Sequence, residues 1–200
     1  ASHPVMEFQQ RAKDWRHGFE DDLVKKVRAI YYAMCAEADA VLGELMDAID
    51  RLGLGEDTLI VFASDHGENN MEHRQWYKMN MYESSVRVPF IVAGAGVQKG
   101  RILGNIVSTI DIFPTFLEAA GVDIPPGTDG ESLMALLQGD ATESRDTAFA
   151  SYTGTTMNTT AWMWRSGIWK YIVYPGFPPQ LFDLEDDPDE VVNRAAERPD

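Results

Sequence analysis

The chain has 200 residues, 44% hydrophobic and 24% charged, a composition typical of a globular protein and not of a disordered or fibrous one. Its 32 acidic residues outnumber its 17 basic ones, for a net charge of −15, so its surface repels DNA and RNA and we expect no nucleic-acid partner. No run reaches the roughly 18 apolar residues that a membrane helix needs, so we expect no membrane partner either.

The first fifty residues predict an irregular segment followed by one long helix. Residues 1–19 show no clear period and are interpreted as a loop. From Asp21 to Leu52, apolar residues recur at three- and four-residue steps, and Gly53 provides a stop, which predicts a single amphipathic helix. The only cysteine, Cys35, lies beside the apolar face of this helix, so we expect it to be a small buried hydrophobe. One cysteine also excludes an internal disulfide and a multi-cysteine zinc site.

Two short apolar runs predict strands of an α/β sheet. The first covers 58–63 and lacks polar–apolar alternation, as expected for a strand that is covered on both faces. The second covers 88–92, and Pro89 near its start favours a sheet edge or a strand beginning.

Two helices follow in the middle of the chain. Ser108 or Thr109 can cap a helix that runs to Ala120, and Pro114 is close enough to its start to be tolerated. A short second helix is predicted over 132–137.

From about Asp146 the sequence becomes rich in aromatic and β-branched residues. The runs 162–165 and 169–174 predict two antiparallel strands joined at Ser166-Gly167. A further short apolar run follows at 181–184. We therefore interpret the end of the chain as a small sheet-rich subdomain.

The stretch that follows the first predicted strand contains the side chains best suited to chemistry. Asp65 and His66 stand where a buried strand meets its loop, the edge at which open α/β sheets bind ligands, and Gly67 allows the backbone to turn sharply. A carboxylate beside an imidazole can supply two ligands to one divalent cation. On spacing alone, a helix-capping aspartate and a structural histidine are the favoured interpretation of the pair.

Three protonatable or basic residues follow within a few positions. His73, Arg74 and Lys78 concentrate positive charge in an otherwise very acidic chain, and such a local reversal of sign is what an anionic substrate requires. The alternative is ordinary solvated surface charge.

Several motifs, in the same order along residues 30–193, resemble the sulfatase family of the alkaline-phosphatase superfamily. They are Asp65-His66-Gly67, Glu72-His73, Lys78, Tyr82–Pro89, Val107–Thr115, Trp169–Ile172 and Pro179–Leu184. Within the family, residues 31–39 and 71–75 are most similar to arylsulfatase K-like enzymes, which remove a 2-sulfate from glucuronate.

The resemblance implies an α/β fold and a division of the chain. Residues 1–145 would be part of an alkaline-phosphatase-like mixed sheet sandwiched by helices. Residues 146–200 would form a small antiparallel α+β C-terminal subdomain, incomplete in this chain.

The resemblance also implies a role for each candidate site residue. Asp65 and His66 would be ligands of calcium, with magnesium as the alternative metal. Lys78 would contact the sulfate and the leaving oxygen, as a catalytic and substrate-binding residue, and His73 would support catalysis from the active-site loop. Arg74 is the weaker candidate for contact with the same anion.

One departure concerns the nucleophile. The family uses a formylglycine made from a cysteine or serine in a Cys-x-Pro-x-Arg setting, and Cys35 is followed instead by Ala36-Glu37-Ala38-Asp39. We therefore expect the nucleophile to lie in a missing N-terminal part of the same enzyme, and the chain alone to be inactive. A second departure is Ser151–Gly154, where arylsulfatase K-like sequences have an acid and a histidine, so the sugar specificity stays open.

The sequence thus predicts a calcium-dependent sulfatase that acts on a sulfated small molecule or glycan. A phosphonate or phosphodiester hydrolase of the same superfamily is the close alternative. A non-catalytic acidic interaction domain that keeps the fold is the alternative from another class.

Overall fold

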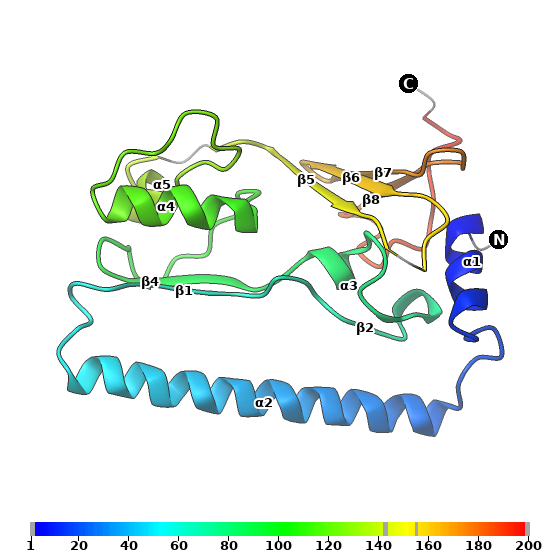
Figure 1. The fold of residues 1–200 in the computed structure, drawn as a ribbon, viewed down its shortest axis with the longest axis horizontal. Coiled ribbons are helices and arrows are strands. Elements are labelled where there is room, and N and C mark those ends of the chain that lie inside the picture. Colours follow the sequence, from blue (N-terminus) through cyan, green and yellow to red (C-terminus); the bar gives the residue numbers. More distant parts are fainter. Residues whose placement is uncertain (1–2, 142–143, 155, 199–200) are drawn as a thin grey trace. The chain divides into compact units, whose positions relative to one another are not determined.

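The computed structural model describes residues 3–141, 144–154 and 156–198 (Figure 1). The chain forms two compact units, each assembled from separate stretches of sequence. The first unit comprises 1–29, 66–88 and 147–200, and the second comprises 30–65 and 89–146. The expected division of the chain at residue 145 stays a prediction.

The N-terminal segment contains a helix that the sequence did not indicate. Residues 1–19 were expected to be a loop, but α1 spans Pro4–Ala12. Its first turn is stabilised by the side chain of His3, whose Nδ1 accepts a hydrogen bond of 3.3 Å from the backbone N–H of Val5. Proline is tolerated at this position because its missing N–H has no intrahelical partner there. Val5, Met6 and Gln9 form the buried face.

The long helix α2 spans Asp21–Arg51, as predicted (Figure 1). None of its residues is buried, and the expectation that Cys35 would be buried is wrong because this thiol is exposed. An amphipathic period shows which face of a helix can pack, but it does not supply a partner for that face. Among the described residues, no helix is both long enough and apolar enough to cross a membrane.

The second unit contains a pair of antiparallel strands. Strand β1, Leu59–Ala63, pairs with β4, Phe90–Gly94, so that Val61 lies opposite Val92. Helix α4, Ile112–Ala119, contacts β1. The prediction that β1 would be covered on both faces is wrong: its side chains are half-buried, and Phe62 is exposed.

The predicted helix at Ser108 begins with a capping box. The Ser108 side chain accepts from the backbone N–H of Asp111, and the Asp111 carboxylate accepts from the Ser108 N–H at 2.7 Å. A short 3-10 turn, η2 at Thr109–Asp111, leads into α4. Asp111 is buried and also forms an ion pair of 2.5 Å with Arg145, while α5 spans Met134–Gln138. Both predicted helices are therefore present.

The first unit is built on a four-stranded antiparallel sheet, in the order β5-β6-β7-β8 (Figure 1). Its strands are β5 Thr147–Tyr152, β6 Ala161–Ser166, β7 Trp169–Val173 and β8 Gln180–Asp183. The predicted hairpin at Ser166-Gly167 joins β6 to β7. Met163, Ile172 and Phe182 on one face of this sheet belong to the same apolar cluster as Val5 and Tyr82. This core holds α1 and residues 81–82 against the sheet.

Residues 69–86 form short elements within the first unit. They are β2 Asn69–Asn70, the 3-10 turn η1 Glu72–Arg74, β3 Trp76–Tyr77 and α3 Glu83–Val86. β2 and β3 pair antiparallel. We refer to residues 66–80 as the site loop, because they contain His66, His73, Arg74 and Lys78.

A fully buried ammonium group joins three parts of the first unit. Lys170 Nζ lies 2.6 Å from a carboxylate oxygen of Glu83, 2.8 Å from one of Glu190 and 3.1 Å from the carbonyl oxygen of Met81. Arg165 lies 3.5 Å from the second oxygen of Glu83, so two cations face two anions. Burial nevertheless raises the pKa of Glu190, and the nearby Lys170 opposes this.

Removal of the Lys170 charge should strongly destabilise the chain. In Lys170→Met, two carboxylates lose their buried partner, and breaking such a group from one side costs about 3–5 kcal/mol. Lys25→Met is the control, because Lys25 forms only an exposed pair with Asp22, worth about 0–1 kcal/mol. Urea unfolding measures both free energies. Equal losses in the two variants would show that the buried cluster is not a main source of stability.

Candidate active site

The site loop contains an unusual concentration of left-handed backbone. Four non-glycine residues have positive φ angles, 77° at Met71, 49° at His73, 58° at Arg74 and 65° at Tyr77. Such conformations cost about 1–3 kcal/mol each and persist only where surrounding contacts impose them. Strain of this kind is concentrated at active and binding sites, which singles out this loop independently of its side-chain chemistry.

Buried amide side chains impose the shape of the site loop. The fully buried Asn69 donates to the carbonyl oxygen of Tyr77 and, at 2.9 Å, to Ser85 Oγ. Gln75, also fully buried, accepts from Asn80 Nδ2 at 2.7 Å, and Asn80 in turn accepts from the Tyr82 N–H at 3.0 Å. These bonds connect the two ends of the loop, so the left-handed residues between them are held in place.

Gly67 is required for close approach and not for an unusual φ angle. A Cβ atom at this position would lie 2.1 Å from the carbonyl oxygen of Ser84, closer than real Cβ contacts allow. The Gly67 N–H donates to Ser85 O at 2.8 Å. The loop is therefore attached directly to α3 immediately after His66.

The start of α2 adds a charged attachment to the loop. Arg28 Nε donates to the carbonyl oxygen of Asn70 at 2.7 Å, and its guanidinium group lies 3.2 Å from the Glu72 carboxylate. The aromatic rings of Phe19 and Trp76 also meet edge to face at 5.5 Å. The segment that precedes α2 thus packs against the β2–β3 hairpin.

The structure brings two of the predicted site residues into direct contact. His66 Nδ1 donates to the carbonyl oxygen of Gly67 at 2.8 Å, which leaves Nε2 with its lone pair, and Lys78 Nζ hydrogen-bonds to that Nε2. His66 is half-buried and Lys78 is exposed, so the ammonium group remains open to an anion from solution. Asp65, the preceding residue, is exposed and is the last residue of the segment 30–65 of the second unit.

His73 is held flat against an aromatic ring. Its imidazole stacks on the ring of Tyr82 with centroids 3.6 Å apart and planes 11° from parallel. Burial lowers the pKa of His73 below its usual 6.5, and Lys170 acts in the same direction, while Glu72, Asp187 and Asp189 oppose them. The side chain is therefore held as a neutral imidazole near pH 7.

Arg74 points to a different neighbourhood. Its guanidinium group lies 3.7 Å from the position that a Cβ of Gly18 would take. Its side chain is exposed, and its suggested contact with the substrate anion stays a prediction.

Tyr82 and the buried amides are the residues whose importance the sequence did not reveal. Tyr82 lies within a recognisable motif, but nothing in the sequence places its ring on His73. Asn69, Gln75 and Asn80 read as ordinary loop residues. A polar residue that is fully buried in a short loop is identified only from coordinates.

The negative charge is distributed unevenly between the two units. The segments of the first unit contain 13 Lys and Arg against 16 Asp and Glu, and those of the second contain 4 against 16. The candidate site loop therefore belongs to the unit in which the charges nearly balance. The first unit is close to neutral but not positive, so the local reversal of sign expected around an anionic ligand stays a prediction.

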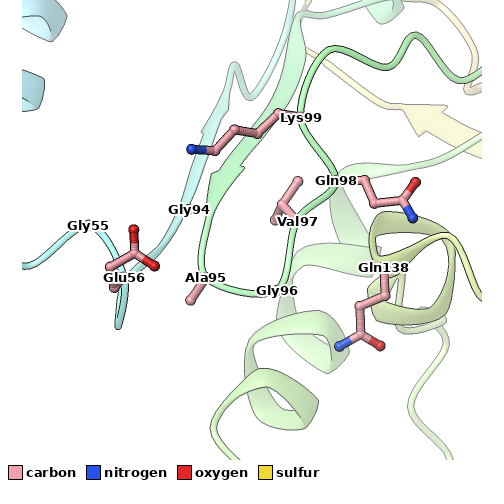
Figure 2. Close-up of a pocket in the computed structure, with 9 residues that line it drawn as sticks. All are labelled: Gly55, Glu56, Gly94, Ala95, Gly96, Val97, Gln98, Lys99 and Gln138. Carbon is pink, nitrogen blue, oxygen red and sulfur yellow. The ribbon is translucent and has the colours of Figure 1, made fainter.

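The second unit contains a pocket whose lining residues lie outside the site loop (Figure 2). It measures about 380 Å³ and is lined by the turn Gly94–Gln98 together with Glu56, Lys99 and Gln138. None of the predicted site residues lines it, and its carboxylate and ammonium groups come from exposed side chains.

Comparison with known families identifies the chain. A family model described as "Sulfatase" matches residues 1–122, and one described as "N-sulphoglucosamine sulphohydrolase, C-terminal" matches residues 71–199. The chain belongs to the sulfatase family.

Individual relatives agree with this assignment. The chain is 42% identical to arylsulfatase K of Mus musculus over 208 residues, which covers 99% of this chain and 38% of that protein. The chain thus spans less than half the length of this curated relative.

Solved structures of other proteins share the fold. The phosphonate monoester hydrolase of Agrobacterium radiobacter superposes with a TM-score of 0.82 at 31% identity, over 92% of this chain and 40% of that one. BT4656, solved with its substrate D-glucosamine-2-N,6-O-disulfate, gives a TM-score of 0.76 at 27% identity, over 92% of this chain and 40% of that one. The chain therefore has part of an alkaline-phosphatase-like α/β fold, as predicted, with an antiparallel sheet near its C-terminus.

The half-buried His3 and His73 should make the stability of the chain depend on pH. Burial lowers the pKa of both His3 and His73 below 6.5, so between the folded and unfolded pKa values the unfolded state binds more protons. The free energy of unfolding should therefore be fully developed above pH 6.5 and should fall as the pH drops below that value.

Urea unfolding at a series of pH values measures this dependence. The decrease on the acid side should be smaller in His73→Gln than in the unchanged chain. His17→Gln is the control for the loss of an exposed histidine. An acid-side decrease of the same size in His73→Gln and the unchanged chain would show that burial of His73 does not contribute.

Proposed function

We propose that the protein is a calcium-dependent sulfuric ester hydrolase that acts on a sulfated sugar, and that this chain carries part of its metal and sulfate site. The observation that carries the proposal is the contact between Lys78 and His66, made in a strained loop of a sulfatase-family chain. The arylsulfatase K relatives and the disulfated glucosamine held by BT4656 support a sulfated sugar as the substrate class.

Lys78 would supply the largest electrostatic contribution from this chain. Hydrolysis of a sulfate ester builds negative charge on the leaving oxygen and on the non-bridging oxygens. An ammonium group about 4 Å from one such oxygen interacts by about 1 kcal/mol in water and about 4 kcal/mol at an effective dielectric near 20. Because Lys78 is exposed here, its effect depends on how far the bound substrate excludes water.

His66 and His73 would have different tasks. The Nδ1 hydrogen bond of His66 to Gly67 fixes the tautomer that presents Nε2 as an acceptor or metal ligand. His73, neutral and immobilised by Tyr82, can donate or accept one hydrogen bond without adding a charge. We assign Arg74 a secondary role as a further contact for the anion.

Asp65 and His66 fit part of a calcium site. Calcium takes six to eight ligands and prefers oxygen, so the Asp65 carboxylate suits it better than the His66 imidazole nitrogen. Among the described residues, no group of three or more His, Cys, Asp or Glu side chains is placed to hold a metal. This chain would therefore contribute two ligands, and the bound cation would offset the negative charge of the sulfate. Magnesium is the alternative ion.

The nucleophile would come from a part of the enzyme that precedes this chain. Cys35 is exposed on α2 and lacks the surrounding residues of a formylglycine site. Because Cys35 does not provide this nucleophile, Lys78 and His66 would polarise a bound sulfate but would not replace covalent catalysis.

Activity measurements test this assignment. The chain alone should not hydrolyse an aryl sulfate or a 2-sulfated uronate. In the complete enzyme, Lys78→Ala should lower kcat and kcat/KM together by at least about tenfold, since the contact is strongest in the transition state. Lys78→Arg should rescue poorly, because a planar guanidinium does not replace a compact ammonium.

Lys99→Ala provides the matched control, since Lys99 is an exposed lysine of the second unit. Turnover within a factor of about two after Lys78→Ala would contradict the proposed role. The similarity to a phosphonate monoester hydrolase keeps a second candidate reaction open. A higher kcat/KM for a phenyl phosphonate monoester than for every sulfate ester tested would favour that reaction over sulfate hydrolysis.

Calcium binding provides a test that does not depend on turnover. Calorimetry on the chain should give a dissociation constant of about 10⁻³ M or weaker, lost on acidification because imidazole must be neutral to bind a metal. Lys78→Met should bind calcium more tightly, since its ammonium no longer occupies His66 Nε2, and Asp65→Asn should bind it more weakly. Tight binding that is unaffected by Asp65→Asn would refute this metal assignment.

A further inference from the structure

Two histidines of the first unit each lie against the ring of a buried tyrosine. The ring of His73 stacks on Tyr82 with centroids 3.6 Å apart, and the ring of His3 lies on Tyr174 with centroids 4.5 Å apart and planes 35° from parallel. Both tyrosines are almost completely buried, at 4% and 1% exposed. The two histidines come from different segments of the first unit, one at the cap of α1 and one in the site loop.

A single buried amide connects the two tyrosines. Gln180 Oε1 accepts from the Tyr174 hydroxyl at 2.8 Å, and Gln180 Nε2 donates to the Tyr82 hydroxyl oxygen at 3.0 Å. An amide has one acceptor end and one donor end, so it serves both hydroxyls in this orientation. Burial raises the pKa of Tyr82 to about 12, which keeps its phenol neutral and able to take part in these bonds.

The position of Gln180 is itself fixed by the sheet. It begins β8, lies opposite Ile172 of β7 and is 5% exposed. Tyr82 is fixed at its other end, because its N–H donates to Asn80 and the adjacent Met81 carbonyl accepts from Lys170. The rings of Tyr82 and Tyr174 are therefore held close to the Gln180 amide.

Both ring nitrogens of His3 form hydrogen bonds. Nε2 donates to the carbonyl oxygen of Pro178 at 2.7 Å, and Nδ1 accepts from the Val5 N–H. Protonation of Nδ1 would remove the cap of α1. Keeping His3 neutral is therefore part of holding α1 in place.

We propose that Gln180 is a positioning residue that fixes both histidine rings, by holding the Tyr82 and Tyr174 hydroxyls on the two ends of one amide. Its meaning for catalysis rests on the proposed function, because His73 is the supporting residue of that site. The placement of the rings does not depend on it. The same amide joins the tyrosine beneath His3 to the tyrosine beneath His73, and each histidine ring depends on its own tyrosine.

The side-chain surroundings of the two histidines are otherwise different. The charged groups that act on His73 are Glu72, Lys170, Asp187 and Asp189, whereas His3 has the backbone of Pro178 as its partner. A change that affects both rings at once therefore points to the shared Gln180.

NMR titration of the histidine ring protons in the chain tests the proposal, with the four histidines assigned from single His→Gln variants. In Gln180→Met, the ring signals of both His3 and His73 should shift, and both titration midpoints should rise toward 6.5. Gln138→Met is the control, because Gln138 is an exposed glutamine of the second unit and should leave both unchanged.

Two variants that each remove one oxygen atom give reciprocal expectations and should preserve the fold. Tyr82→Phe should shift the signals of His73 and leave those of His3 in place, and Tyr174→Phe should do the opposite. A Gln180→Met chain in which both histidines keep their native signals, or a Tyr82→Phe chain in which His73 is unchanged, would overturn the proposal. This readout is independent of activity. Absence of the expected signal shifts refutes the role of Gln180, whereas a Lys78→Ala enzyme with normal turnover refutes the proposed function.

Discussion

The arrangement of the first unit depends on the ammonium group of Lys170. It lies on the inner face of β7 and brings together the Met81 carbonyl, the Glu83 carboxylate and the Glu190 carboxylate. Buried charges are tolerated only when they are paired in good geometry, so these segments are held to the sheet and to one another. The segment held most closely contains Tyr82, whose ring sets the plane of His73. An interior ion cluster thus helps to position the half-buried side chain of His73.

Much of the regular structure could be predicted from the sequence, because its signals are local. The period of α2, the capping box at Ser108 and the hairpin at Ser166-Gly167 each depend on residues a few positions apart. The errors occurred where the outcome depends on distant contacts. Helix α1 needs its cap at His3 and a buried face against the sheet, and the burial of Cys35 needed a partner for α2 that the described residues do not provide.

The candidate site shows the same division. The order Asp-His-Gly with a lysine beyond it could be recognised in the sequence, and the structure places Lys78 on His66. The left-handed backbone at Met71, His73 and Arg74 could not be predicted, because these residue types do not favour it. It is imposed by Asn69, Gln75 and Asn80, whose burial follows from the assembled unit and not from the loop sequence.

Gly67 limits how this loop can be redesigned. The space beside its Cα is filled by the Ser84 carbonyl, and its N–H is bonded to Ser85, so even a methyl group would force the loop away from α3. His66 would move with it and lose its contact with Lys78. Engineering a new ligand preference therefore has to keep position 67 fixed and change exposed side chains of the loop such as Arg74.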